Sequence, residues 1–206
     1  LVALSRPLLA DPAFVRKMEL GLDKEIRKCI ACNACMPLGE RVSQCSVNPE
    51  LGRERPYRIW PAFTLKRKKV LIVGGGVAGM EAARVAALRG QEVTLWEKAG
   101  RLGGLVNLAA ALPRLFTREL GNIVEWLSDQ LSQLPVNIQL NKVANAELIE
   151  KFKSEVVILA VGSQIVPLQI PGINRTSVVT LDQYLAGEAK VGEKVAVIGA
   201  AYGTEI

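Results

Sequence analysis

The stretch that decides the fold is KVLIVGGGVAG, residues 69–79. After Lys69 its first part is an unbroken apolar run, as expected of a strand that is buried on both faces of a parallel sheet. The glycines that follow have the spacing Gly-x-Gly-x-x-Gly, at Gly74, Gly76 and Gly79. In this pattern the first glycine allows a tight turn and the second lets a pyrophosphate approach the backbone. The third lets the following helix pack closely.

The residues beyond this loop complete a strand, helix and strand unit. Residues 80–88 are good helix formers, Gly90 ends them, and residues 92–96 read as a second strand. Glu97 follows that strand directly, where an acid can accept hydrogen bonds from both hydroxyls of an adenosine ribose. The helix N-terminus at residues 77–79 supplies a positive end for the phosphates. The unit therefore predicts a dinucleotide-binding domain, and the alternative is a Rossmann-like unit without a ligand.

The rest of the chain continues this domain and then begins another. The same signals predict loops at residues 103–104 and 109–113, a helix at 119–134, and strands at 136–140 and 156–160. A glycine and proline break at residues 170–172 suits a crossover to a second domain. Residues 195–198 then read as a strand entering a glycine loop that is one residue short of the pattern and has Ala201 at the close-approach position. Too few residues follow Val195 for the ~30 of a complete unit, so we expect a piece of a larger protein.

The four cysteines lie close together in the sequence, as Cys29, Cys32, Cys35 and Cys45. No secretory signal is predicted, and three crowded thiolates cannot all form low-strain disulfides with one another. A loop around a metal centre uses such crowding. Zinc sites usually come as two separated Cys-x-x-Cys pairs, so the spacing favours a 4Fe-4S cluster. Zinc and free buried thiols remain the alternatives.

Composition excludes several functions. A chain of 206 residues that is 50% hydrophobic and 22% charged is typical of a soluble globular protein with one well-buried core. It contains no histidine, which excludes imidazole from any catalytic or ligand role. Much of the net charge of +6 lies in residues 53–69, where prolines interrupt the aromatic residues, so we expect a basic linker and no nucleic-acid partner. No apolar run approaches the ~20 residues of a membrane span, so we expect no membrane partner and a cytoplasmic protein.

A cysteine loop followed by an FAD-type dinucleotide fold and a second glycine loop resembles the C-terminal part of the old yellow enzyme-like oxidoreductases. That family includes 2,4-dienoyl-CoA reductase, enoate reductases, bacterial NADH:flavin oxidoreductases and trimethylamine dehydrogenase. The resemblance covers nearly the whole chain. LVALSRPLLADP at residues 1–12 resembles the last strand of an FMN-binding TIM barrel and its turn, and residues 14–20 resemble the final helix. CIACNAC with CSVNPELGRE resembles the cluster segment, and RLGGLVNLAAALP, LGNIVEWL, ILAVGS and IPGI resemble the FAD domain.

The resemblance implies an α/β fold in four parts. These are the end of the barrel at residues 1–24, the iron-sulfur segment and linker at 25–66, the Rossmann-like FAD domain at 67–174, and the start of an NAD(P) domain at 175–206. The implied FAD contacts are Gly74, Gly76, Ala78, Gly79, Glu97, Lys98, Arg101, Gly104, Arg118, Val143, Ala160 and Gly162. The other implied contacts are Arg6 for the FMN phosphate, Gly199 and Gly203 for NAD(P), and the four cysteines for the 4Fe-4S cluster. Catalytic and substrate residues are expected upstream of Leu1.

The family's activity would be an electron relay. NAD(P)H would give hydride to FAD, the cluster would pass electrons singly to FMN, and FMN would deliver hydride to an activated C=C bond of an unsaturated acid, thioester or enone. The short cysteine spacing and the imperfect second glycine loop also fit an amine dehydrogenase that passes electrons to an electron-transfer flavoprotein. A non-catalytic nucleotide-binding module with structural zinc and a glutamate synthase-like small subunit are further readings. A homo-oligomer is also compatible with the sequence.

Overall fold

The computed structural model describes residues 2–36, 44–54, 66–111, 118–163 and 169–198. The chain divides into two compact units, Leu1–Gln164 and Ile165–Ile206. Within the described residues, no helix combines the length and the apolar character that crossing a bilayer requires. The boundaries predicted after residues 24, 66 and 174 remain predictions.

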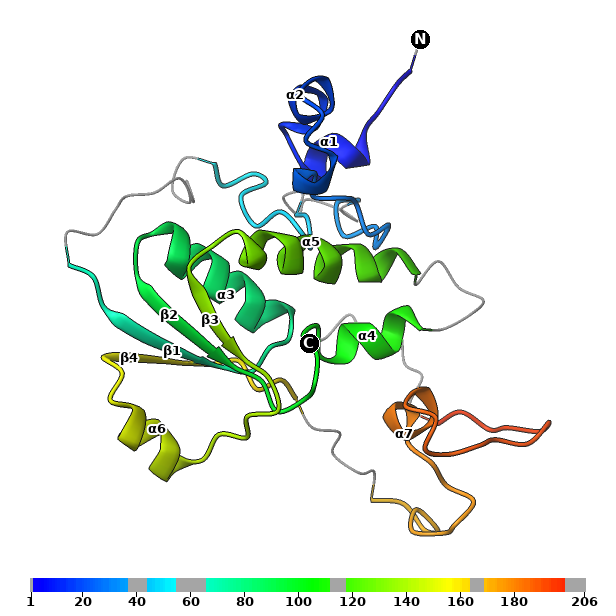
Figure 1. Cartoon of the computed structure of the whole chain (residues 1–206). Coiled ribbons are helices and arrows are strands. Elements are labelled where there is room, and N and C mark those ends of the chain that lie inside the picture. Colours follow the sequence, from blue (N-terminus) through cyan, green and yellow to red (C-terminus); the bar gives the residue numbers. More distant parts are fainter. Residues whose placement is uncertain (1, 37–43, 55–65, 112–117, 164–168, 199–206) are drawn as a thin grey trace. The chain divides into compact units, whose positions relative to one another are not determined.

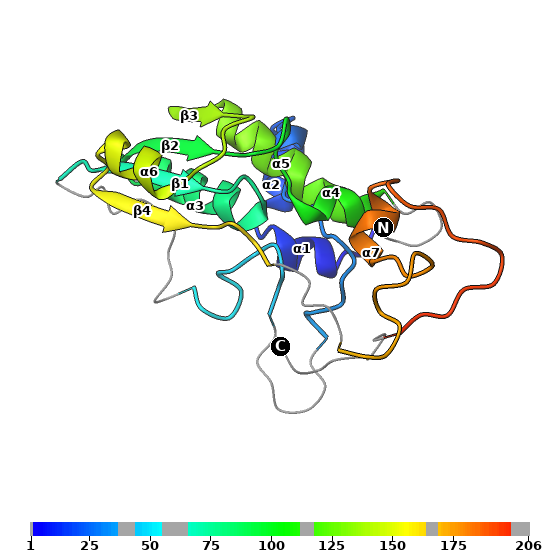
Figure 2. The same cartoon turned by 90° about the horizontal axis from the view of Figure 1, so that it is seen from below.

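The first unit contains a parallel sheet of four strands in the order β3-β2-β1-β4, which Figure 2 shows from below. The strands are β1 (Lys69–Val73), β2 (Glu92–Trp96), β3 (Val136–Gln139) and β4 (Val156–Leu159). The central strand β1 pairs with β2 on one side and with β4 on the other. The strand order therefore reverses beside β1, and ligands of such sheets bind at the carboxyl ends of the strands at this point. The strands predicted at residues 92–96, 136–140 and 156–160 are confirmed, with ends that differ by at most one residue.

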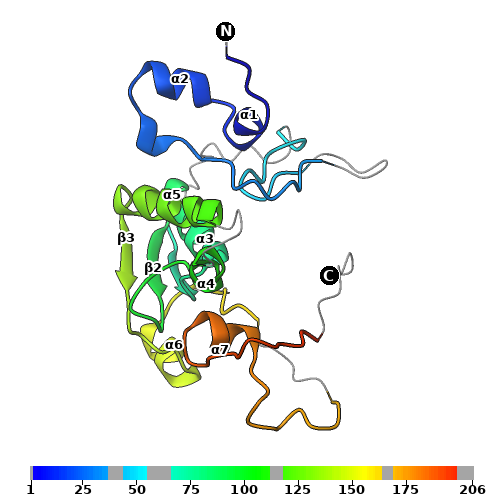
Figure 3. The ribbon, with the colours of Figure 1, turned by 90° about the vertical axis from the view of Figure 1, so that its right-hand side faces the viewer.

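Helices cover both faces of the sheet. The helices α3 (Val77–Leu88) and α5 (Gly121–Ser132) lie side by side on one face, and α6 (Ala146–Phe152) packs on the other (Figures 1 and 3). Side chains alternate between the faces along β1, because Val70 and Ile72 pack with the first pair of helices and Leu71 and Val73 with α6. This double coverage explains the unbroken apolar run in β1.

The helix ends follow local signals. Gly76 is the N-cap of α3, and Gly90 follows its C-cap in the left-handed region, with φ of +79°. The α5 residues Ile123, Trp126 and Leu127 have the spacing of one helical face and are all buried. Asn145 caps α6, where its side chain accepts a hydrogen bond of 2.8 Å from the Leu148 N–H.

The segment before the cysteines is helical, which corrects one prediction. It contains α1 (Arg6–Ala10), α2 (Phe14–Glu19) and the 3-10 turn η1 (Asp23–Glu25). The helix expected at residues 14–20 is confirmed by α2. The barrel strand expected within residues 1–12 is not formed in residues 2–12, where the chain enters α1 with proline in its first turn.

Two further expectations are corrected. Residues 109 and 110, expected in a loop, end the helix α4 (Leu105–Ala110), and the 3-10 turn η2 (Arg118–Leu120) precedes α5. In the second unit, α7 (Leu181–Leu185) begins with a capping box made by Thr180 and Gln183. The strand expected at residues 195–198 is absent, because in the described part of this unit no strand pairs with it. The side chains of Val195, Val197 and Ile198 are exposed.

Candidate functional site

Two glycines, Gly74 in the loop after β1 and Gly79 in the first turn of α3, are required by packing within the protein itself. Gly74 has φ of +108°, a conformation that favours glycine, and its N–H donates to the Trp96 carbonyl at 2.8 Å. A Cβ at Gly74 would lie 2.2 Å from the Ala160 carbonyl oxygen, at the end of β4. A Cβ at Gly79 would lie 1.9 Å from the Gly74 oxygen. The loop, α3 and β4 therefore approach one another so closely that neither position has room for a side chain.

Gly76 is different, because a Cβ there would meet no atom within 4 Å. Its backbone is extended, with φ of −70° and ψ of 175°, which any residue can adopt. Neither packing nor backbone strain therefore explains a glycine at this position, whereas a ligand that must approach the backbone does. This open space is the observation that fits a bound dinucleotide.

The start of α3 faces that space with backbone donors. The first hydrogen bond of the helix runs from Met80 N–H to the Gly76 carbonyl at 2.9 Å, so the N–H groups of Val77, Ala78 and Gly79 precede it. Because these donors lie at the positive end of the helix dipole, they suit the phosphates of a nucleotide. Ala78, predicted to contact FAD, is one of these three residues, and its contact with the cofactor stays a prediction.

A second glycine pair lies against the first loop. Gly103 N–H donates to the Gly75 carbonyl at 2.8 Å, and Gly103 forms a bridge with Gly76. A Cβ at Gly104 would lie 3.1 Å from the Gly76 Cα. The Asn107 amide secures this second loop by donating to the Leu102 carbonyl at 2.7 Å. Nothing in the sequence pattern singled out Asn107, whereas Gly104 was predicted and lies beside the candidate site.

Glu97 is buried, with 7% of its surface exposed, and is aimed at the glycine loop. One carboxylate oxygen accepts from Gly75 N–H at 2.5 Å and the other from Ala99 N–H at 2.7 Å. Each carboxylate oxygen has a further lone pair that can accept a hydroxyl. Two backbone donors thus fix the acid in an orientation that can bind ribose.

The remaining predicted contacts lie around this centre or outside the described residues. Lys98 and Arg101 are exposed in the turn after β2, and Arg118 is exposed in η2. Val143 is 67% exposed, next to Lys142, whose N–H donates to the Glu97 carbonyl at 2.8 Å. The structure therefore gathers Gly74, Gly76, Gly79, Glu97, Gly104 and Ala160. Gly162 is exposed beyond β4, and Gly199 and Gly203 lie outside the residues described.

The cysteine segment shows four free thiols. Cys29, Cys35 and Cys45 are half-buried and Cys32 is exposed. The two parts of the motif are in contact, because the Cys32 thiol donates to the hydroxyl of Ser46 at 3.3 Å. Among the cysteine and acidic side chains that the structure describes, no group of three is arranged to hold a metal ion. The four-cysteine ligand set therefore stays a prediction.

The backbone of this segment nevertheless has features that suit sulfur ligands. Ala31 N–H donates to the Cys29 sulfur at 3.4 Å, and such bonds tune the potential of iron-sulfur clusters. Ala31 and Asn33 both have positive φ, of 55° and 58°. Non-glycine residues in this conformation are uncommon and are concentrated at functional sites. The donor set, four uncombined thiols with an amide donor, fits the chemistry of a cluster.

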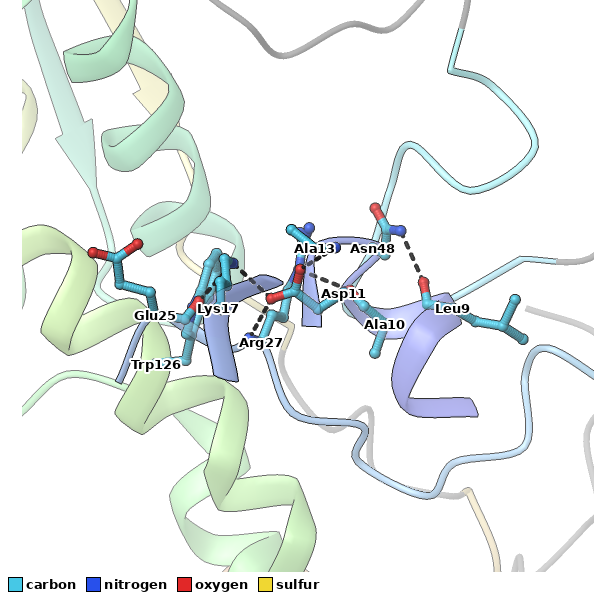
Figure 4. Close-up of polar contacts among 9 residues, drawn as sticks. All are labelled: Leu9, Ala10, Asp11, Ala13, Lys17, Glu25, Arg27, Asn48 and Trp126. Carbon is cyan, nitrogen blue, oxygen red and sulfur yellow. Dashed lines mark hydrogen bonds and ion pairs between the residues drawn. The ribbon is translucent and has the colours of Figure 1, made fainter. Parts of the chain in front are cut away.

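A buried carboxylate organises the chain before the cysteines (Figure 4). The Asp11 side chain accepts hydrogen bonds from Lys17 Nζ at 2.6 Å, from Arg27 N–H at 2.9 Å and from Ala13 N–H at 3.0 Å. Burial alone would raise the pKa of Asp11, but these donors and the Lys17 charge outweigh it, so the pKa lies below the ordinary 3.8. Arg6, predicted to bind the FMN phosphate, donates to the Asn33 side chain at 2.7 Å and so contacts the cysteine segment.

A parallel sheet with a Gly-x-Gly-x-x-Gly loop at its switch point and an oriented acid after the second strand defines a dinucleotide-binding protein. The chain belongs to the pyridine nucleotide-disulphide oxidoreductase family, whose model matches residues 68–205.

Similarity extends beyond this domain. The chain is 42% identical to a cinnamate reductase from Clostridium sporogenes over 97% of its own length and 30% of that protein. Among solved structures, it is similar to a 2-naphthoyl-CoA reductase complex, with a TM-score of 0.85 and 33% identity over 91% of this chain and 28% of that one. It is also similar to histamine dehydrogenase from Rhizobium sp. 4-9, with a TM-score of 0.78 and 31% identity over 92% and 29%.

These matches confirm the resemblance to the old yellow enzyme-like flavin oxidoreductases and the predicted fold class. They agree with the predicted FAD, FMN, 4Fe-4S cluster and NAD(P)H. The chain spans about 30% of the length of the curated relatives it matches.

Proposed function

We propose that this chain is part of an NAD(P)H-dependent flavin and iron-sulfur oxidoreductase, which reduces an activated C=C bond of an unsaturated acid, thioester or enone. The observation that carries the proposal is the open space at Gly76, bordered by helix donors and by the fixed Glu97 carboxylate. Cinnamate is an unsaturated acid and 2-naphthoyl-CoA is a thioester, so the names of two similar proteins support these substrate classes.

Different residues of the chain bind different parts of the cofactors. Glu97 accepts hydrogen bonds from the ribose of FAD, the N–H groups of residues 77–79 receive the pyrophosphate, and Lys98 and Arg101 add positive charge nearby. The four cysteines hold the cluster. Arg6 binds the FMN phosphate, and Gly199 with Gly203 receives the nicotinamide nucleotide. When bound, the flavins supply hydride chemistry and the cluster supplies one-electron transfer between centres too far apart to exchange hydride.

A second candidate function is the oxidation of an amine, with electrons leaving through an electron-transfer flavoprotein. Similarity to histamine dehydrogenase and the short spacing of the first three cysteines favour it. In both cases the partners are a small-molecule substrate and a redox carrier, and we place the enzyme in the cytoplasm.

Anaerobic stopped-flow spectroscopy of the full protein distinguishes these functions. A C=C reductase is expected to lose its flavin absorbance on mixing with NADH or NADPH and to regain it when cinnamate or a related enoate is added. An amine dehydrogenase would instead lose it with histamine or trimethylamine and not with the nicotinamides. Protein that is colourless after anaerobic purification would contradict both and would support a zinc-containing nucleotide-binding module.

A further inference from the structure

One aromatic side chain connects the cysteine segment to the dinucleotide domain. Trp126 lies on α5 and is 7% exposed. The guanidinium carbon of Arg27 lies 5.0 Å from the centroid of its ring, and that of Arg84 lies 5.1 Å from it. The indole N–H also donates to the Glu25 carbonyl at 2.9 Å (Figure 4). We call these three contacts of Trp126, with Arg27, Arg84 and the Glu25 carbonyl, the joint.

The two arginines belong to different parts of the chain, Arg27 to the cysteine segment and Arg84 to the dinucleotide domain. Arg27 lies two residues before Cys29, and its side chain donates to the Ala10 carbonyl at 3.1 Å. Arg84 lies on α3, the helix whose first turn borders the open space at Gly76. Trp126 therefore contacts, through one ring, both the backbone that leads into the cysteines and the helix that receives the nucleotide.

The charges at the joint are balanced so that two cations can share one ring. Arg84 forms two hydrogen bonds of 2.8 Å with the Glu81 carboxylate. Cation–π contacts of this kind strengthen as the cation is desolvated. Trp126 and Arg84 are buried and Arg27 is half-buried, so the joint is largely shielded from solvent.

We propose that Trp126 is a positioning residue, which fixes the cysteine segment against the dinucleotide domain and thereby sets the rate of single-electron transfer between FAD and the cluster. This inference rests on the proposed function. Each transfer oxidises reduced FAD by one electron and reduces the cluster by one, NAD(P)H supplies the electrons, and no bond forms between the centres. The transfer depends on their separation, whereas hydride transfer from the nicotinamide to FAD does not involve the joint.

Three variants of the full protein test the proposal. Trp126→Ala removes the ring and its N–H, Trp126→Phe keeps an aromatic face and loses the N–H, and Leu127→Ala is the matched control. Leu127 is the next residue on α5 and is fully buried. It belongs to the hydrophobic core of α3 and α5. The control therefore weakens the same helix while it leaves the indole in place.

The kinetic readout separates the two transfers after anaerobic mixing with NADH or NADPH. Flavin absorbance follows hydride transfer, and the electron paramagnetic resonance of rapidly frozen samples follows reduction of the cluster. In Trp126→Ala the cluster is expected to be reduced about tenfold more slowly, because the loss of two cation–π contacts and a hydrogen bond releases the cysteine segment and the separation of the centres is no longer fixed. Flavin reduction is expected to keep its rate. Trp126→Phe should restore cluster reduction to within about threefold, since the ring still contacts the arginines. Equal slowing in Leu127→Ala, or no slowing in Trp126→Ala, would overturn the proposal.

Hydrogen exchange supplies a readout that does not depend on electron transfer. Backbone amides of residues 23–29 should exchange faster in Trp126→Ala than in Leu127→Ala, because the Glu25 carbonyl and the Arg27 side chain lose their anchor. Equal exchange in these two variants would show that Trp126 does not hold the segment and would overturn the proposal. If nicotinamides fail to reduce the unmodified protein, the proposed function fails, and the exchange comparison still decides whether the joint exists.

Discussion

Substitution of Gly76 by alanine separates ligand binding from folding more sharply than any other change in the loop. A Cβ at this position meets no protein atom within 4 Å. The free energy of unfolding should therefore change by no more than about 0.5 kcal/mol, because two effects oppose each other: alanine restricts the unfolded chain, which stabilises the protein, and it is a poorer N-cap than glycine, which destabilises it. The methyl group would occupy the space through which the pyrophosphate approaches the backbone. FAD affinity should fall at least about tenfold, or about 1.4 kcal/mol.

Gly79→Ala is the matched control, because its Cβ would lie 1.9 Å from the Gly74 carbonyl oxygen. The backbone must move to relieve this overlap, so we expect a loss of about 1–3 kcal/mol in the free energy of unfolding. Urea unfolding followed by circular dichroism measures stability, and titration of flavin-depleted protein with FAD measures affinity. If Gly76→Ala bound FAD as tightly as the unmodified protein, or was as unstable as Gly79→Ala, the reasoning would be refuted.

Three further predictions concern Glu97, Asp11 and Cys32. Glu97→Gln should weaken FAD binding and lower the free energy of unfolding by about 1–3 kcal/mol, because its amide nitrogen would face a backbone N–H. FAD titration measures the first effect and urea unfolding the second. Asp11 has a lowered pKa, so its contribution to stability is present above pH 3.8 and is lost as the pH falls through the folded-state pKa. Asp11→Asn should therefore be less stable at pH 7 by about 1–3 kcal/mol and should converge with the unmodified protein in acid. If urea unfolding showed the same difference in stability between Asp11→Asn and the unmodified protein at every pH, this prediction would be contradicted. Cys32→Ser should lose iron on purification, whereas Ser46→Ala, which removes only the hydrogen-bond partner of that thiol, should retain it; equal iron in both would contradict the ligand role.

Local patterns in the sequence were sufficient for the nucleotide loop. Gly74 and Gly79 are required by the tight turn and the close packing that the spacing implied. At Gly76 the space is open, as a ligand close to the backbone would need, and the ligand itself stays a prediction. Glu97 was predicted from its place at the end of a strand, and the structure shows it buried and oriented toward the loop. These features depend on residues within one strand, helix and strand unit, so local sequence determines them.

Predictions failed where a segment depends on a neighbour. The apolar residues at 195–198 have strand character, but a strand forms only when its backbone pairs with another one. For residues 2–12, proline at the start of α1 favours a helix, and the expected barrel strand has no partner in the described sheet. The first residues of the loop expected at 109–113 belong to α4, because the good helix formers that begin at Leu105 extend the helix to Ala110.

The joint at Trp126 could not be predicted from the sequence. The helical spacing of Ile123, Trp126 and Leu127 indicates a buried face and says nothing of what covers it. Arg27 and Arg84 are distant in sequence, and isolated arginines give no periodic signal. The role of Asp11 could not be predicted either, because two of its three donors, the Lys17 side chain and the Arg27 backbone, lie outside its local sequence.

The most direct test of the account is the content of iron and acid-labile sulfide in anaerobically purified full-length protein, with electron paramagnetic resonance after reduction. The account predicts about four iron and four sulfide per chain and the signal of a reduced 4Fe-4S cluster, all lost when the cysteines are replaced by serine. Protein that contains one zinc ion and no sulfide, or in which the four cysteines are paired as disulfides, would contradict it.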